Sequence, residues 1–200
     1  MARKLKKKYS RPTHLWQMER IKEEKQLRKE YGYKNKKEIW KMQSILRNFR
    51  AQARRLIPLT DKQAQLEKKQ LLSRLYSLGL VKENAQIEDV LALTIRDILE
   101  RRLQTLVFRK KMANTIKQAR QFITHGHIVI GDKKVTSPSH LVRVDEEPLI
   151  GFAPNSPLAN EMHPERMAVK SKEKKEEAKE PTEEEIEEKE IKELAEEIGE

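Results

Sequence analysis

The sequence predicts an α+β protein with a mostly helical N-terminal domain, a small mixed module and a disordered acidic C-terminal tail. Three observations favour this class. Apolar residues recur at helical spacing over most of residues 14–100. After Gly126 the pattern changes to short β-branched runs separated by turn residues, which is typical of strands. From Ser171 the chain consists of Lys/Glu repeats with few apolar residues, a composition that does not support a packed core.

The composition limits the size of any core. The 200 residues are 36% hydrophobic and 38% charged, so we expect two small cores rather than one large core. The predicted parts are a basic arm over residues 1–13, a helical domain over 14–100, a module with its return segment over 101–167, and the tail over 168–200. Residues 145–165 are expected to return near the helical domain.

The formal net charge of +11 is unevenly distributed along the chain. Residues 171–200 hold six Lys and fourteen Glu, whereas residues 1–60 hold nineteen basic and five acidic groups. The part of the chain before residue 171, which we call the body, is therefore strongly basic, and this predicts a polyanionic partner. We expect the tail not to bind RNA and to shield the basic surface from stray nucleic acid. The alternative is that the basic surface is only a solvated one.

The sequence lacks the residues that several kinds of site require. Without Cys, the sequence predicts no disulfide and no thiolate metal site, and it suits a reducing cytosol. No apolar run approaches the roughly 20 residues of a membrane span, so no membrane partner is expected. His125 and His127 have no further ligands nearby in the sequence, so no metal is expected. Because the chain has no Gly-rich phosphate loop, nucleophile elbow or Rossmann fingerprint, we predict no cofactor and no enzymatic activity.

The N-terminal domain is predicted to consist of helices. They are expected over about residues 12–29, 35–56, 60–78 and 88–101, the last of them unbroken. Trp40 lies in register with the apolar stripe of the second helix, so we interpret it as a packing residue rather than a base-stacking one.

The best-defined element is a helix from Thr115 to Gly126. Thr115 is a good N-cap, Gln118 completes a capping box, and Thr60 with Gln63 forms a second box of this kind. Gly126 fits the C′ position, where φ is positive. The apolar and cationic faces consist of Ile116, Ala119, Phe122 and Ile123 and, opposite them, of Lys117, Arg120, Gln121 and Thr124. The cationic face suits phosphate, and Arg120 is expected to be exposed, so that its removal leaves the fold intact.

A β unit is expected directly after this helix. Residues 127–136 read as a hairpin with a two-residue turn at Gly131-Asp132. Residues 141–144 alternate like a half-exposed strand, and 149–152 read as a last short strand. The hairpin should place two lysines beside the cationic helix face.

These residues resemble a known RNA-binding family. The run 118–130, followed by 133–135 and 137–139, is similar to the α-L RNA-binding module, also called the S-four domain. Residues 101–105 before it resemble the archaeal and eukaryotic branch of the ribosomal protein S-four family, as do 14–17 and 38–40.

This resemblance covers about residues 1–167 and implies a function. It implies a structural constituent of the small ribosomal subunit that binds small-subunit rRNA at a multi-helix junction, nucleates assembly and influences translational accuracy. The implied partners are small-subunit rRNA, neighbouring small-subunit ribosomal proteins and mRNA where it enters, and the implied location is the cytoplasmic ribosome.

The residues expected to contact RNA are basic, polar or aromatic and lie in the arm, on the second helix and in the module. They are Arg3, Lys4, Lys6, Lys7, Lys8, Tyr9, Arg47, Arg50, Arg54, Arg101, Arg102, Gln104, Arg109, Lys110, Thr115, Lys117, Gln118, Arg120, Gln121, His125, His127, Lys133, Lys134, Ser137 and Ser139.

Two alternative functions share the same module. In an RNA-modifying enzyme it would be an RNA-binding handle, and a second domain with a catalytic Asp or a cofactor loop would be expected. In a pre-ribosomal RNA-processing protein the whole layout would recur, with association to a small nucleolar RNA instead of mature subunits.

Overall fold

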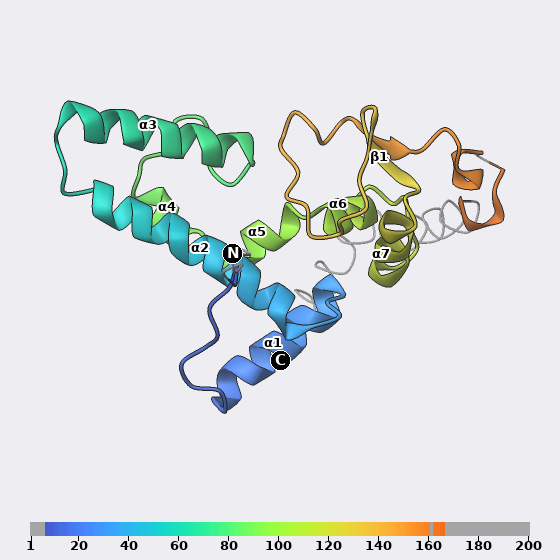
Figure 1. Cartoon of the computed structure of the whole chain (residues 1–200), viewed down its shortest axis with the longest axis horizontal. Coiled ribbons are helices and arrows are strands. Elements are labelled where there is room, and N and C mark those ends of the chain that lie inside the picture. The colour runs from blue at the N-terminus through green and yellow to red at the C-terminus, as the bar shows by residue number, and fades with distance from the viewer. Residues whose placement is uncertain (1–6, 161, 167–200) are drawn as a thin grey trace, which may run out of the picture.

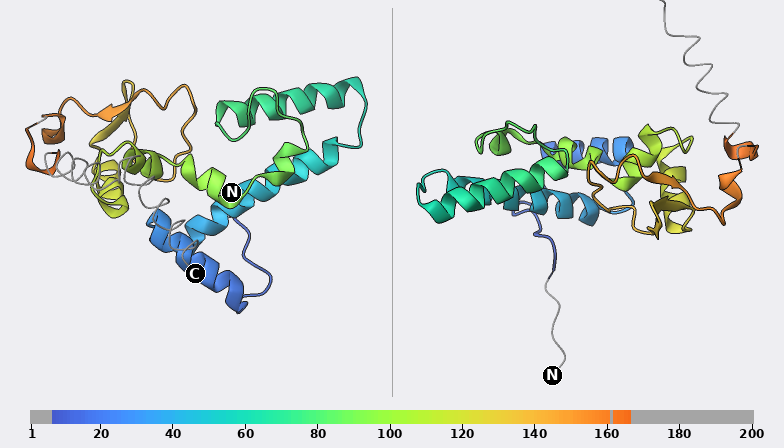
Figure 2. Two further views of the ribbon diagram at one scale, coloured as in Figure 1. Left: turned by 180° about the vertical axis from the view of Figure 1, so that it is seen from behind. Right: turned by 90° about the horizontal axis from the view of Figure 1, so that it is seen from above.

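The computed structural model describes residues 7–160 and 162–166, which form two lobes lying side by side (Figure 1). The expectations for Arg3, Lys4, Lys6 and the acidic tail fall outside these residues. Each lobe has its own cluster of buried apolar side chains, as the composition predicts. Seen from above, the lobes share one layer and the first described residues leave it on one side (Figure 2).

The first lobe is helical because its apolar residues follow the helical period. Its elements are α1 (Met18–Tyr31), α2 (Lys36–Leu56), α3 (Lys62–Ser77), α4 (Asp89–Ala92) and α5 (Ile95–Glu100). The long helix α2 buries Ile39, Met42 and Phe49 along one stripe, against which the other helices pack. Leu75 of α3 and Ile98 of α5 are fully buried in the same core.

Three helix boundaries differ from the prediction. Helix α1 begins at Met18 after Gln17 rather than near residue 12, so residues 12–16 lie before the helix. Helix α3 begins at Lys62 after Asp61, and the Gln63 amide donates to Glu67, so no capping box forms at Thr60. The expected helix over 88–101 is two helices. The Thr94 backbone N–H donates to the Asp97 carboxylate at 2.7 Å, which starts a new helix at this point.

The second lobe consists of two helices and a small sheet. Its elements are α6 (Leu103–Arg109), α7 (Ile116–Thr124), β1 (Ile128–Ile130), β2 (Lys133–Lys134), β3 (Ile150–Phe152) and the 3-10 helix η1 (Pro157–Ala159). The strands are antiparallel in the order β2-β1-β3, and the predicted hairpin pairs Ile130 with Lys133. Leu103, Ile123 and Ile128 are fully buried between the helices and the sheet.

Two predictions about the C-terminal half were wrong. Residues 141–144 form no strand. Leu141 makes only an isolated bridge with Arg102, and Val142 is buried in the second core. Residues 145–165 do not return to the helical domain as a unit, because β3 pairs with the free edge of β1 and Leu158 enters the second core. Burial does not alternate over 141–144 either, since Leu141 packs against the first core, Val142 is buried in the second and Val144 is exposed.

Among the described residues, no helix combines the length and the apolar character needed to cross a membrane.

Candidate RNA interface

Helix α7 carries the candidate interface because its two faces differ. Thr115 Oγ1 accepts from the Gln118 backbone N–H at 3.1 Å, and Gly126 has φ +75°, so both predicted ends are confirmed. The Gln118 side chain departs from the predicted box, since it accepts from the Asn114 N–H at 2.7 Å. Phe122 faces the second core, while Lys117, Gln121 and Thr124 are exposed on the outer side.

The hairpin places its lysines at the C-terminal end of α7. Lys133 and Lys134 are exposed, and the Lys134 side chain lies so close to Gly126 that a Cβ added at this glycine would collide with it. The positive φ is what favours a glycine here, since the flexible end of the Lys134 side chain can move aside. Lys117, Lys133 and Lys134 are exposed and have no carboxylate partner among the described residues, and we call these three cations together the α7–hairpin surface.

The two histidines next to this surface have different environments. Their rings are stacked with centroids 6.3 Å apart. His127 lies 2.8 Å from Ser156 Oγ through Nδ1 and packs edge-on against Phe122, so it is mainly a packing residue. His125 is exposed and remains a candidate RNA contact. Within residues 7–160 and 162–166, no group of three His, Cys, Asp or Glu side chains could hold a metal ion.

The prediction that Arg120 is an exposed cation was wrong. Its guanidinium donates to both oxygens of Glu38 at 2.9 and 3.0 Å. Arg102 donates to the same carboxylate at 3.2 Å, is fully buried, and stacks over the Tyr33 ring with 4.3 Å to the centroid. Burial raises the pKa of the Tyr33 hydroxyl to about 12, although Arg102 opposes this shift.

These two arginines therefore join the lobes, since Glu38 lies in the first turn of α2. We call Arg102, Arg120 and Glu38 the interlobe ion cluster. The residues of each pair are 64 and 82 positions apart, so sequence spacing could not reveal them.

Other residues that were expected to contact RNA also make hydrogen bonds or ion pairs within the protein. Gln104 is fully buried and donates to the Ile116 carbonyl at 3.0 Å, so its prediction as an RNA contact was wrong. Arg101 is largely buried and pairs with Glu147 at 2.7 Å. Arg109 is exposed but pairs with Glu100 at 2.9 Å, whose hydrogen bond and charge raise the pKa of this guanidinium.

The remaining expected contacts of the module lie at its surface. Lys110 is exposed and donates to the Glu147 carbonyl. Ser137 and Ser139 lie in the loop after the hairpin with their hydroxyls 3.4 Å apart. They remain candidates, as does the exposed Thr115.

The arm folds back along α2. The Ser10 N–H donates to Ser44 Oγ at 3.0 Å, and Arg47 donates to Ser10 Oγ at 2.6 Å. The Tyr9 ring lies 6.2 Å from the Trp40 ring. Tyr9 and Arg47 thus fix the arm, while Lys7, Lys8 and Arg54 are exposed and free to meet phosphate.

Trp40 and Arg50 serve the packing of the first lobe. The Trp40 indole N–H donates to the Glu24 carboxylate at 3.0 Å, which agrees with its interpretation as a packing residue. Arg50 is half-buried and donates to the Leu93 carbonyl, so its guanidinium is only partly available.

A groove between the lobes adds Arg28 and Lys29, two cations that the sequence analysis missed, to the predicted Lys117. It measures about 820 Å³ and lies between the end of α1 and the start of α7. Its charged lining consists of Lys25, Arg28, Lys29 and Lys117. The spacing of three and four residues in α1 puts its cations on one side, a signal that could have found them.

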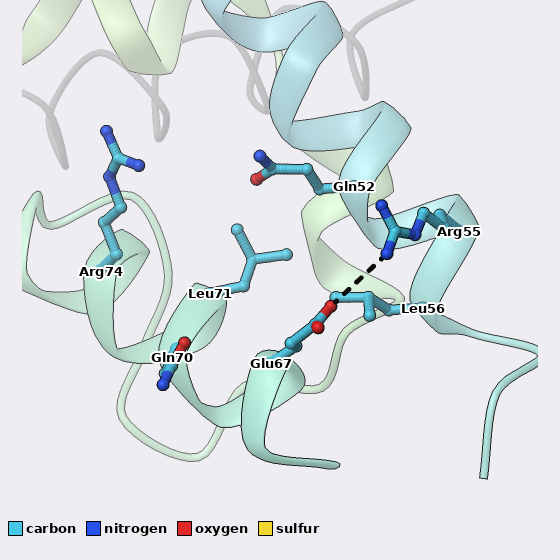
Figure 3. A pocket seen from close by; sticks show the side chains of 7 residues that line it. All are labelled: Gln52, Arg55, Leu56, Glu67, Gln70, Leu71 and Arg74. Carbon is cyan, nitrogen blue, oxygen red and sulfur yellow. Dashed lines mark ion pairs between the residues drawn. The ribbon is translucent and has the colours of Figure 1, made fainter. Parts of the chain in front are cut away.

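A smaller hollow between α2 and α3 has a mixed lining. It measures about 340 Å³, with Leu56 and Leu71 beside Gln52, Gln70 and Arg74, and Arg55 reaches across it to Glu67 at 3.9 Å (Figure 3). Because an acidic side chain neutralises one of its arginines, this hollow is less suited to phosphate than the groove between the lobes.

Comparisons with known proteins give the family of this chain. The S4 domain family model matches residues 101–147. Small ribosomal subunit protein uS4 of Methanococcus aeolicus is 56% identical over 165 residues, which span 82% of this chain and 93% of that protein. Its namesake from Ignicoccus hospitalis is 55% identical over 155 residues, which span 78% and 93%. That of Methanococcus maripaludis is 52% identical over 173 residues, which span 86% and 97%. The chain therefore belongs to the family of small ribosomal subunit protein uS4 and carries its S4 domain.

Proposed function

We propose that this protein is a constituent of the small ribosomal subunit, works in the cytoplasmic ribosome, and binds small-subunit rRNA directly. The observation that carries the proposal is the family membership, which extends over most of the chain and includes the S4 domain. It is supported by the α7–hairpin surface, whose free cations lie inside that domain.

The chemistry of the surface favours phosphate and sugar as the first targets. Lys117, Lys133 and Lys134 neutralise phosphates and release counterions, which supplies affinity without sequence preference. Gln121 and Thr124 offer an amide and a hydroxyl on the same side, suited to the 2′-OH groups of an A-form minor groove. The groove between the lobes and the exposed lysines of the arm extend this contact to further rRNA helices.

The cations have two different roles, and this difference suits a protein that contacts several rRNA helices. The interlobe ion cluster holds the two lobes in one arrangement, so their basic surfaces present a fixed spacing to the rRNA. A rigid clamp of this kind suits a multi-helix junction and an early step of assembly. Neighbouring small-subunit proteins and incoming mRNA are its further partners, and through them it influences decoding accuracy.

Family membership argues against one of the two alternatives. The chain is a ribosomal protein rather than an RNA-modifying enzyme. The pre-ribosomal alternative is separated by fractionation of cells on a sucrose gradient. We expect the protein in mature small subunits, and finding it only in precursor particles would contradict the proposal.

A binding experiment tests the site. A triple variant, Lys117→Ala with Lys133→Ala and Lys134→Ala, is titrated with Methanococcus maripaludis small-subunit rRNA at several salt concentrations. We expect weaker binding and a slope of log K against log salt reduced by roughly two to three, because three phosphates are no longer neutralised. The matched control replaces Lys62, Lys69 and Lys82, which are exposed on α3 and in the following connector. Equal decreases in affinity for both triples would contradict the α7–hairpin surface as the site.

A further inference from the structure

A tryptophan at the start of the first lobe is almost completely exposed. Trp16 retains 90% of its accessible surface, and the neighbouring Leu15 and Met18 retain 53% and 67%. Tryptophan carries a large apolar area, so full exposure in a free protein indicates a surface that is covered in a complex.

The backbone that presents Trp16 is held in place. Arg20 donates through Nη2 to the carbonyls of His14 and Leu15 at 3.1 and 2.8 Å. The same guanidinium pairs with the buried Glu24. The segment before α1 is therefore preorganised, and the exposed indole does not result from a loose chain end.

The charges that precede this segment in the sequence favour RNA as the partner. Lys7, Lys8 and Arg11, which precede Trp16 in the sequence, are exposed, and the first acidic residue of the whole chain is Glu19, which is exposed three residues after Trp16. Protein interfaces are depleted of lysine, whereas RNA sites combine cations with aromatic rings on which unpaired bases stack. An indole that stands clear of the surface leaves its flat face open to such a base.

We propose that Trp16 is a base-stacking residue that receives an unpaired nucleobase of small-subunit rRNA. The inference rests on the proposed function and adds an interaction of different chemistry, since stacking is independent of phosphate neutralisation. Lys7, Lys8 and Arg11 hold the backbone of the same RNA segment.

Substitutions of Trp16 distinguish stacking of its ring on a base from burial of any apolar side chain against the RNA. On Methanococcus maripaludis small-subunit rRNA, Trp16→Ala is expected to weaken binding roughly 5- to 150-fold, which is the range for loss of one stacked base. Trp16→Phe should restore most of the affinity, while Trp16→Leu should bind like the alanine variant. The slope of log K against log salt should stay unchanged, whereas Lys8→Ala should lower it by roughly 0.7–0.9.

The control removes another exposed aromatic ring. Tyr76 on α3 is 48% exposed, and Tyr76→Ala should bind like the wild type. Wild-type affinity in Trp16→Ala, equal binding by the Leu and Phe variants, or an equal decrease in Tyr76→Ala would each overturn the inference. If the wild-type protein itself failed to bind this rRNA, the proposed function would fail instead.

The partner class is settled by crosslinking. A photoreactive aromatic amino acid replaces Trp16 in the full chain, and small subunits assembled with it are irradiated. We expect the crosslink on an unpaired nucleotide of the rRNA. A crosslink to a ribosomal protein, to paired RNA, or to nothing would overturn the stacking role.

Discussion

At the residue scale, cations of the same helix have different roles. Lys117 and Arg120 are separated by less than one turn of α7. The lysine is exposed to solvent, whereas the arginine is three-quarters buried at its side chain and bound to Glu38. A basic residue in the sequence therefore indicates an RNA contact only where no carboxylate of another element reaches it.

Lys117→Ala tests the free cation by itself. We expect an unchanged free energy of unfolding, because an exposed charge contributes little to stability. The slope of log K against log salt for rRNA should fall by roughly 0.7–0.9, because one phosphate is no longer neutralised. Salt titration with circular dichroism measures both, and Lys82→Ala is the matched control. An unchanged slope would show that Lys117 does not meet phosphate.

Phe122→Ala tests the opposite face of α7. The ring is buried in the second core and meets Phe152 edge-on at 6.4 Å between centroids. We expect a loss of roughly 3–5 kcal/mol in the free energy of unfolding, because the substitution leaves a cavity. Urea unfolding measures it against Gln121→Ala, which is exposed on the same helix. A loss below about 1 kcal/mol would mean that the core repacks around the smaller side chain.

At the element scale, α1 and α2 are joined by a buried carboxylate. Glu24 accepts from the Trp40 indole and lies 3.3 Å from Lys36, besides its pair with Arg20. Burial alone would raise the pKa of Glu24, but the hydrogen bonds from Trp40, Arg20 and Lys36 outweigh it and lower the pKa.

This shift predicts a pH dependence of stability. Because the folded pKa lies below the ordinary value of 4.5, the contribution of Glu24 is present above that value. It is lost as the pH falls through the folded pKa. Urea midpoints between about pH 7 and pH 3 should therefore decrease at the acid end, and Glu24→Gln should reduce that decrease. A decrease of the same size in the variant would assign it to other carboxylates.

The interlobe ion cluster predicts how strongly the two lobes depend on each other. Glu38→Gln leaves the guanidinium of Arg102 buried without its counter-charge, which costs roughly 3–5 kcal/mol. Arg120→Ala should cost less, since its side chain is 25% exposed. Urea unfolding compares them with Arg109→Ala, which breaks an exposed pair and should cost at most about 1 kcal/mol. Equal losses for all three would contradict the role of burial.

Elements specified by local chemistry were predicted best. The helix from Thr115 and the hairpin at Gly131 were predictable because a cap, a C′ glycine and a two-residue turn act within a few positions. The helix break at Thr94 was not, because a continuous apolar pattern hides a cap in its middle. Residues 141–144 show the same limit, since their alternating pattern matches neither a strand nor the burial observed, in which Val142 is buried and Val144 exposed.

At the scale of the whole molecule, the charge of the chain is divided between body and tail. The body carries the free lysines, while residues 171–200 hold fourteen Glu against six Lys. We predict that the tail opposes non-specific association with nucleic acid and contributes nothing to the specific site.

Deletion of residues 168–200 tests this division. Affinity for small-subunit rRNA should remain unchanged, while binding to an unrelated RNA at low salt should increase, because an acidic competitor is removed. Filter binding to both RNAs measures the two effects, with an internal control in which the tail glutamates are replaced by Gln. Loss of specific binding on deletion would make the tail a part of the site.

The site was predictable only in part, because some of its residues meet their partners only in the complete tertiary fold. Composition and motif led to the α7–hairpin surface, where Lys117, Lys133 and Lys134 are exposed as expected. Arg102 and Gln104 were misassigned because their partners, Glu38 and Ile116, meet them only through the tertiary fold. Arg28 and Lys29 of the groove have a helical spacing that the sequence does show, but the sequence does not show that α7 lies opposite them.

The position of β3 in the sheet has a consequence for the order of synthesis. The buried members of the first core end at Leu99, so that core can close while the ribosome is still translating the remainder of the message. The second core contains Ile150 and Leu158, and its central strand keeps an unpaired edge until those residues have been made. During translation the nascent chain therefore passes through a stage with one finished lobe and one open sheet edge, which is the stage most exposed to misassembly and chaperone capture.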